Sequence, residues 1–544
     1  MMQEQAQLVV TIPCHLRSSA AQAVVDECEK SVWPLVRQPS IGMHGGMVSA
    51  PFSFQVFLAA SDIAVLRLLA HYDGHTRNSF DDFPVSGERE VGSQLREAAS
   101  RNPSRFLKLL PTYWANISDN FCDAIMEGVA AYLAHRHGNL QANGSWTPIE
   151  EPDAVILARN LLDELDRHPA YWHHNRAASN ALQACAHVIQ NRQDAGRLVF
   201  WTIDFSTLSE QSSISGDGVD LITVGINMAR GHVVEALMIL ANQLGKITPW
   251  PELLAPALRR FAADEHPAIR AVLLRRLPYL QSHHPDLGWD LFECVMRKHA
   301  AGLWPAAERC LYYAYYEQFE IVAPLLARLS CEGSGKDLET WGRISALAAL
   351  SKQLEFSAFL SDITAIDSAE AWRGATSVWT NANNMEQHRE QCVAGLEAGS
   401  SADNQHAGVV ALKIERLFRE TSPPTSVPSE LIKRCFAAHE ANPATHKSDV
   451  YGFEAWLNAT SQRDAEQSLS AAEIYLGFVR SAKPHLYGHG NDLTQLLTRL
   501  FAQSEEQEES DGGAMLRRVV ALQDTMLALG FGEMNEWLKA AERP

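Results

Sequence analysis

The sequence predicts an all-α chain built from stacked helix pairs. Three observations favour this fold class: apolar residues recur at three- and four-residue spacings, strand-like segments are few, and helix pairs repeat roughly every 35 to 45 residues. A single pair cannot bury its apolar face alone, so neighbouring pairs must stack. We therefore expect a right-handed α-solenoid of irregular helix pairs, HEAT-like in the middle of the chain and TPR-like further on.

The clearest helices lie between residues 229 and 350. Ala229 to Leu244 is one apolar helix, which Gly245 can end. Pro251 to Ala262 and Pro267 to Leu280 form a helical hairpin, because a proline fits the first turn of a helix and Asp264 to His266 supplies a polar turn. Further helices are predicted at Leu287 to His299, Pro305 to Tyr316, Phe319 to Leu329, Leu338 to Leu350, Ala514 to Leu529 and Glu533 to Ala541.

Five segments are predicted to be loops: 138–153, 206–220, 395–408, 421–430 and 503–513. Prolines stop the helix in the fourth, and the glutamates of the fifth indicate a solvated acidic loop. Only residues 7–12 and 198–205 resemble strands, and the second is equally consistent with the end of a helix. We divide the chain into a separable N-terminal helical region (1–100), helical repeats (101–205), HEAT-like repeats (220–395) and C-terminal helical repeats (430–544).

Composition excludes several classes of protein. Hydrophobic residues make up 46% of the 544 residues, which excludes a wholly disordered chain. The 46 basic and 65 acidic residues give a net charge of −19, which argues against a surface that binds nucleic acid throughout. We expect no signal peptide, no membrane span and a cytoplasmic location. The nine scattered cysteines lack any Cys-x-x-Cys pair, so we expect free, mostly buried thiols.

Phosphate-binding and nucleophile motifs are incomplete. The string Gly333 to Lys336 resembles part of a P-loop, but Ser330 stands where the first glycine belongs and Asp337 where the magnesium-binding hydroxyl belongs. No Gly-x-Ser-x-Gly elbow occurs. The string Tyr487 to Asp492 places His489 between two glycines, but the sequence names no partner for this histidine, so a loop is the better interpretation.

The histidines do not predict a metal site. His173 and His174, with His168 nearby, and His283 and His284 are adjacent pairs. Neighbours on a helix point about 100° apart, so they do not converge on one ion. We interpret them as solvated loop residues, and we expect no catalytic residue, no metal and no cofactor.

Two groups of surface residues are candidates for binding a partner. The first is an arginine group on consecutive helices, formed by Arg259, Arg260, Arg270, Arg275 and Arg276. The alternative, which we favour, is ion pairing between stacked repeats. The second is a tyrosine run, formed by Tyr312, Tyr313, Tyr315 and Tyr316. Four tyrosines cannot all face one helical core, and tyrosine is enriched at binding hot spots, although packing at the edge of the core is the alternative.

Three stretches resemble a known family. Asn102 to Leu110, Gly225 to Leu237 and Asp264 to Arg270 are similar, in order and spacing, to the long helical region of bacterial STAND-type (NACHT-like) NTPases. The matching motif positions are Asn227, Arg230, Gly231, Asp264, Pro267 and Arg270. The resemblance extends over about 100 to 350, and its family recognises foreign proteins in antiviral defence. The ATPase module of that family is absent from this chain, so only the helical sensor or scaffold region carries over.

We therefore expect a non-enzymatic, protein-binding helical-repeat module, a recognition or scaffold component of a bacterial antiviral-type defence system. Its partner would be a foreign (phage) protein or another subunit of that system, and the acidic net charge favours a basic partner. One alternative is a nucleic-acid-associated module with a local basic stripe between Arg259 and Arg276. The other is an enzyme with an unrecognised site near His489 or His168 to His174.

Overall fold

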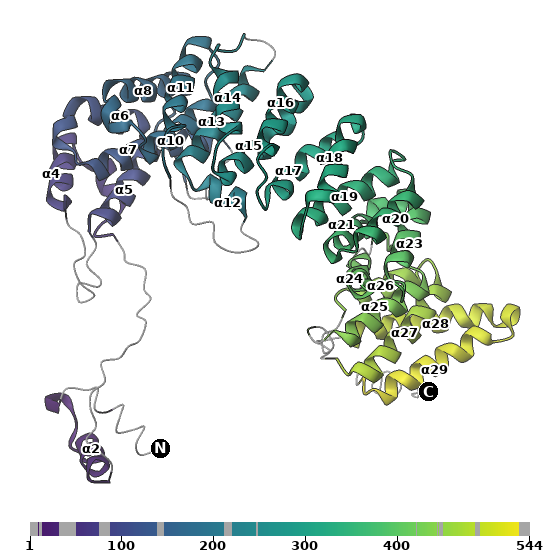
Figure 1. Cartoon of the computed structure of the whole chain (residues 1–544). Helices are drawn as coiled ribbons and strands as arrows, with labels where there is room; N and C mark the ends of the chain where they lie inside the picture. Colours follow the sequence, from purple (N-terminus) through teal and green to yellow (C-terminus); the bar gives the residue numbers. More distant parts are fainter. Residues whose placement is uncertain are drawn as a thin grey trace. The chain divides into compact units, whose positions relative to one another are not determined.

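The computed structural model of the chain describes residues 9, 14–31, 50–74, 87–138, 146–210, 220–245, 249–419, 422–442, 444, 450–484 and 490–531. Every regular element in these residues is helical, which confirms the predicted all-α class (Figure 1). The chain divides into two compact units, residues 1–94 and 95–544. Among the described helices, none combines the length and the apolar character needed to cross a bilayer.

The first unit contains α2 (Ser19–Ser31), α3 (Phe54–Ala59), α4 (Asp62–Tyr72) and the start of α5 (Glu88–Arg101). Phe57 and Leu69 are buried, and the ring of Phe52 contacts both Phe57 and Tyr72. The amide of Phe54, at the first turn of α3, donates a hydrogen bond of 2.7 Å to the side chain of Gln94. A small aromatic and aliphatic core therefore holds α3 and α4 together.

The second unit continues with a long series of helices. Its first half consists of α6 (Pro103–Tyr113), α7 (Asp119–His137), α8 (Ala154–Arg167), α9 (Pro169–Trp172), α10 (Arg176–Ala186), α11 (Arg192–Phe205), α12 (Leu221–Ile226), α13 (Ala229–Leu244), α14 (Leu254–Ala262), α15 (Pro267–His283) and α16 (Pro285–Met296). In α13 and α15 the residues at the predicted starts, Ala229 and Pro267, begin the helices. Pro267 sits at the first helical position of α15, as its lack of an N–H favours.

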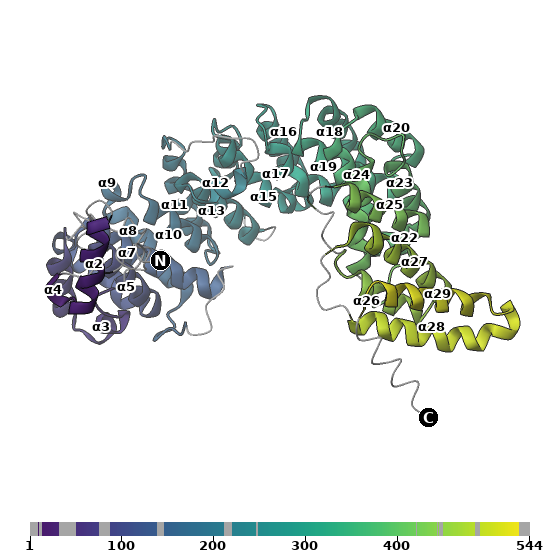
Figure 2. The ribbon, with the colours of Figure 1, turned by 90° about the horizontal axis from the view of Figure 1, so that it is seen from below.

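The second half consists of α17 (Leu303–Ala314), α18 (Phe319–Glu332), α19 (Lys336–Leu350), α20 (Phe356–Ile366), α21 (Ala369–Trp379), α22 (Ala382–Gln387), α23 (Arg389–Gly399), α24 (Ala407–Lys413), α25 (Ser429–Ala441), α26 (Phe453–Ser461), α27 (Ala465–Ala482), α28 (Gly490–Asp511) and α29 (Ala514–Ala528). Figure 2 shows α28 and α29 side by side, and the two helices pack together. The end of the chain, including the predicted helix Glu533 to Ala541, lies outside the described residues.

Helices of the second unit form two series, and within each series every helix packs against the next. In one series α7 contacts α10, α10 contacts α13, α13 contacts α15, and the contacts continue through α17, α19 and α21. In the other series α6 contacts α8, α8 contacts α11, α11 contacts α14, and α14 contacts α16. Contacts such as α10 with α11 and α15 with α16 join the two series. Each helix therefore buries residues against both its own partner and the next pair.

Two predictions of local structure are wrong. The predicted acidic loop 503–513 is helical as far as Asp511, because glutamate and glutamine are good helix formers and the glutamates stay exposed on α28. The predicted loop 395–408 is helical up to Gly399, and α24 starts at Ala407. The strand-like segment 198–205 is the end of α11, and segment 7–12 lies almost wholly outside the described residues.

The eight cysteines whose side chains the structure describes are free thiols. Cys122, Cys185, Cys310, Cys392 and Cys435 are buried, whereas Cys14 and Cys331 are exposed. Burial raises the pKa of the Cys122 and Cys392 thiols to about 12, so both stay protonated and unreactive at neutral pH.

Candidate functional site

A cavity of about 600 Å³ opens between helices of the second unit, lined by residues of α5, α7, α10, α12, α13 and α15. Part of its wall consists of alanines of α7 and α10, whose short side chains leave the space open. We call it the arginine groove, after its charged lining residues, which are Arg96, Glu127, Arg176, Glu235, Arg275 and Arg276. Residues almost 200 positions apart in the chain therefore meet in one place.

Ion pairs neutralise only part of this groove. Arg276 Nε lies 2.6 Å from Glu235 Oε2, and Arg275 lies 3.7 Å from the other carboxylate oxygen of Glu235. Arg96 lies 3.3 Å from Glu127. Arg176 is exposed and forms no ion pair with any residue that the structure describes. Four arginines face two glutamates, so the groove carries a net charge of +2 in a chain with a net charge of −19.

Two histidines at the groove are neutral at pH 7. His232 Nδ1 lies 2.8 Å from the amide oxygen of Gln183, and burial, followed by the nearby charge of Arg176, lowers the pKa of His232 to about 4. Burial and the charge of Arg276 also lower the pKa of His187. The positive charge of the groove is therefore that of its arginines alone.

The predicted arginine group does not form one patch. Only Arg275 and Arg276 line the groove. Arg259 is exposed and pairs with Asp290 at 2.7 Å, and Arg260 is exposed on α14. Arg270 is only 2% exposed, and it donates hydrogen bonds to the main-chain oxygens of Val295, at 2.7 Å, and of Lys298. Because Arg270 is buried, it is out of reach of a partner.

The family-motif residues lie where helices join. Arg230, near the start of α13, donates two hydrogen bonds of 3.0 and 2.9 Å to the carboxylate of Asp264, in the turn before α15. Both side chains are buried, at 9% and 6% exposed. Asp264 also accepts a hydrogen bond from the amide of His266, which fixes the turn that Pro267 follows. The Arg230–Asp264 pair therefore locks α13 to the turn between α14 and α15.

Gly231 and Asn227 shape the junction of α12 and α13. A side-chain carbon at position 231 would overlap the carbonyl oxygen of Gly225, so only glycine permits this close approach. The side chain of Asn227 donates a hydrogen bond of 2.8 Å to the carbonyl of Thr223. Glu210, which sequence patterns did not single out, accepts hydrogen bonds from the amides of Ala229 and Arg230 and so caps the start of α13.

The tyrosine run lies at the C-terminal end of α17, whose last residue is Ala314. Tyr312, Tyr313 and Tyr316 are 48%, 67% and 61% exposed, whereas Tyr315 is half-buried, and burial raises the pKa of the Tyr315 phenol. The rings of Tyr312 and Tyr313 meet edge to face at 5.4 Å. The tyrosines are therefore a surface cluster, separate from the residues that line the arginine groove.

Other candidate strings have simpler roles or cannot be placed. The P-loop-like string Gly333 to Lys336 is the turn between α18 and α19, and Lys336 is the first residue of α19. His489 lies outside the described residues. His168 stacks flat on Trp114 at 3.7 Å. His283 stacks on Tyr279 at 4.0 Å.

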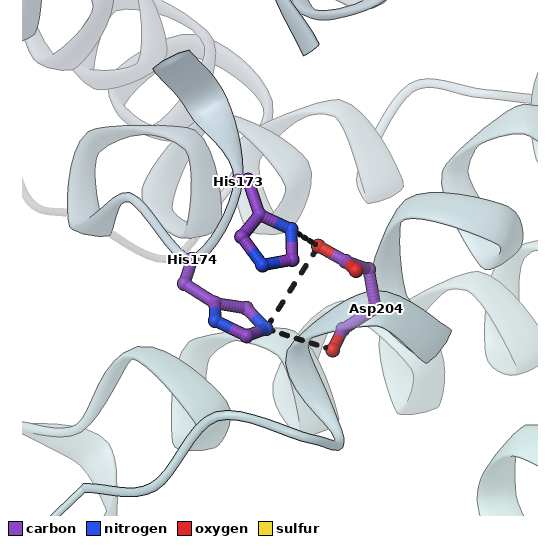
Figure 3. Close-up of side chains that lie close together, drawn as sticks. All are labelled: His173, His174 and Asp204. Carbon is purple, nitrogen blue, oxygen red and sulfur yellow. Dashed lines mark hydrogen bonds and ion pairs between the residues drawn. The ribbon is translucent and has the colours of Figure 1, made fainter. Parts of the chain in front are cut away.

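The expectation that His173 and His174 diverge is wrong. They follow the end of α9 rather than lie in a helix, and His174 adopts a left-handed backbone conformation with φ of 55°. Figure 3 shows both rings turned toward Asp204 of α11, and one nitrogen or oxygen atom from each of the three side chains lies within 4.8 Å of the others. Among the described residues, this is the one group whose geometry could hold a metal ion.

In comparisons with known proteins, no family model, no characterised protein and no solved structure matches the chain.

Proposed function

We propose that the chain is a non-enzymatic, helical-repeat protein-binding module whose second unit is an α-solenoid of HEAT-like and TPR-like pairs. The support is the alternation of helix contacts, in which α7, α10, α13 and α15 form one series and α6, α8, α11 and α14 form the other. Stacked helix pairs of this kind present extended surfaces that bind partners.

The arginine groove is the binding site in this proposal. The observation that carries it is a cavity of about 600 Å³ with a net charge of +2, in which Arg176 is exposed and has no ion pair with a described residue. Arginine binds carboxylates in a planar, two-pronged geometry. The groove therefore favours an acidic segment of a protein partner, in contrast to the basic partner that the net charge of the whole chain favours.

The biological setting of the proposal rests on the resemblance to the helical region of STAND-type NTPases. Neighbouring helices are held together by three of the motif residues, Arg230, Asp264 and Arg270. The motif therefore supports the fold, and in this proposal the residues of the groove select the partner. In this setting the module is a cytoplasmic recognition or scaffold component of a bacterial defence system. Partners captured only from infected cells would support recognition of a foreign protein, and the same partners in uninfected cells would support a scaffold.

A direct test is fluorescence anisotropy with labelled peptides rich in aspartate and glutamate, against lysine-rich peptides and single-stranded oligonucleotides of the same length. We expect the acidic peptides to bind and Arg176→Glu to weaken binding about tenfold or more, since a charge-assisted contact contributes about 1.5–3 kcal/mol. Arg260→Glu, an exposed arginine outside the groove, is the matched control and should leave binding unchanged. Preferential binding of oligonucleotides would instead favour a nucleic-acid partner.

A further inference from the structure

The turn after α9 brings two adjacent histidines together. α9 ends at Trp172, and His173 and His174 then cross toward the last turn of α11, where Asp204 lies. His174 has a left-handed backbone conformation, which is uncommon for a residue other than glycine, and the two successive rings point the same way (Figure 3). The rings stack with their centroids 3.7 Å apart.

The spacing of the donor atoms fits a small cation. His173 Nδ1 lies 2.7 Å and His174 Nε2 lies 3.9 Å from Asp204 Oδ2 (Figure 3). Zinc binds nitrogen and carboxylate oxygen at about 2.0–2.2 Å in a tetrahedral arrangement, which places neighbouring ligand atoms about 3.3 Å apart. The two observed separations lie on either side of that value, and the three donor atoms all lie within 4.8 Å of one another, so side-chain movements can bring them to one ion.

Charge and hydrogen bonding also favour a cation. The Asp204 carboxylate is negatively charged and faces both rings, and a divalent cation that displaces the ring hydrogens there gains two nitrogen lone pairs. His174 Nε2 now lies 3.0 Å from the main-chain oxygen of Asp204. The hydroxyl of Thr207 donates a hydrogen bond of 2.9 Å to the same oxygen, so that oxygen keeps a donor when Nε2 turns to a metal.

We propose that His173, His174 and Asp204 form a binding site for a divalent transition metal ion of the zinc type. Two imidazole nitrogens and one carboxylate oxygen suit zinc, whereas magnesium and calcium prefer oxygen ligands alone. Three protein ligands leave one tetrahedral position open for water or an exogenous ligand. The ion would tie the turn between α9 and α10 to the end of α11, and the site is separate from the arginine groove.

The test is a zinc titration of the full chain, freed of any purification tag, by isothermal calorimetry in a buffer that does not bind zinc. We expect one site that binds Zn²⁺ and ignores Mg²⁺, with an X-ray absorption spectrum of nitrogen and oxygen ligands at about 2.0–2.2 Å. His173→Ala, His174→Ala and Asp204→Asn should each weaken binding about tenfold or more. Circular dichroism checks that each variant is folded.

The matched control is His283→Ala, which removes an exposed ring that stacks on a neighbouring aromatic ring of its own helix and leaves the cluster intact. It should bind zinc as the unaltered chain does. Three results would overturn the proposal: no zinc bound at micromolar concentration, equal affinity in the cluster variants and the control, or a spectrum dominated by sulfur from the cysteines.

Discussion

The stretch from α12 to α16 and the stretch from α19 to α21 hold their helices together by different means. In the first, buried charged side chains cross between elements, as in the Arg230–Asp264 pair. In the second, α19 and α21 approach so closely that Gly342 faces the carbonyl of Ala371 and Gly374 faces the carbonyl of Glu339. Close approaches at glycine occur in both stretches, since Gly231 also meets the carbonyl of Gly225, but the first stretch adds a buried ion pair between its elements.

This difference determines which changes each stretch tolerates. A buried ion pair is sensitive to the loss of atoms, because the remaining charge is left without its partner. A glycine contact is sensitive to the addition of atoms, because the two backbones cannot move apart without disturbing the helices around them. Substitutions that remove a charge in one stretch and add a methyl group in the other therefore test the comparison from both sides.

Asp264→Ala should have the largest effect. It removes the closer of the two carboxylates beside the buried Arg230 guanidinium and leaves Glu210, at 3.5 Å, as the remaining one, so we expect a destabilisation of up to about 3–5 kcal/mol. Hydrogen exchange of the α13 and α15 amides, followed by mass spectrometry, measures the local free energy of opening. The exposed Arg259–Asp290 pair is the control, and Arg259→Ala should change that free energy by less than about 1 kcal/mol. Equal changes in the free energy of opening in the two variants would contradict the claim that the buried ion pair stabilises this stretch more than the exposed one.

Gly374→Ala should have the next largest effect. The added methyl group overlaps the carbonyl oxygen of Glu339, so α19 and α21 must separate, at a cost of about 1–3 kcal/mol. Gly477→Ala in α27 is the matched control, because nothing lies within 4 Å of the added carbon, and it should stabilise by about 0.5–1 kcal/mol. The melting temperatures should therefore move in opposite directions. A shift of the same sign in both variants would contradict the close approach of α19 and α21.

His232 provides a third effect, which is a dependence of stability on pH. Burial, followed by the charge of Arg176, lowers the pKa of His232 to about 4, below its usual value near 6.5. The unfolded chain therefore takes up the proton first, so this contribution to stability is complete above pH 6.5 and is lost as the pH falls from about 6.5 to about 4. The slope is at most about 1.4 kcal/mol per pH unit.

Urea unfolding of the chain and of His232→Gln across this pH range measures the contribution. Glutamine can still donate a hydrogen bond toward Gln183 but does not titrate, so the unfolding free energy of the unaltered chain should fall relative to that of the variant as the pH falls. A difference that stays constant from pH 7 to pH 4 would contradict the buried, neutral state of His232.

The sequence predicted the helices well where the signal is local. Pro267 begins α15 and Gly245 follows α13, because both residues act through their own backbone. The resemblance singled out the motif residues Arg230 and Asp264, and the structure pairs them. The glutamate-rich stretch of α28 was predicted wrongly because charge alone does not separate a solvated loop from an exposed helix.

The groove and the histidine cluster could not be predicted from local patterns. Arg96, Arg176 and Arg276 come from three helices that meet only after the chain has folded. His173 and His174 converge at a turn in which His174 adopts a left-handed conformation, and Asp204, their third member, lies thirty positions further on. Such sites depend on tertiary contacts, whereas the spacing of apolar residues predicts only where each helix lies and which face it buries.

The central claim is that the arginine groove binds an acidic segment, and a charge-swap cycle tests it most directly. The affinities of an acidic peptide and of its lysine-substituted counterpart are measured for the unaltered chain and for Arg176→Glu. The account predicts that the unaltered chain prefers the acidic peptide, and that Arg176→Glu weakens this binding about tenfold while strengthening binding of the lysine peptide. Affinities that change by the same factor for both peptides, or for neither, would contradict the claim.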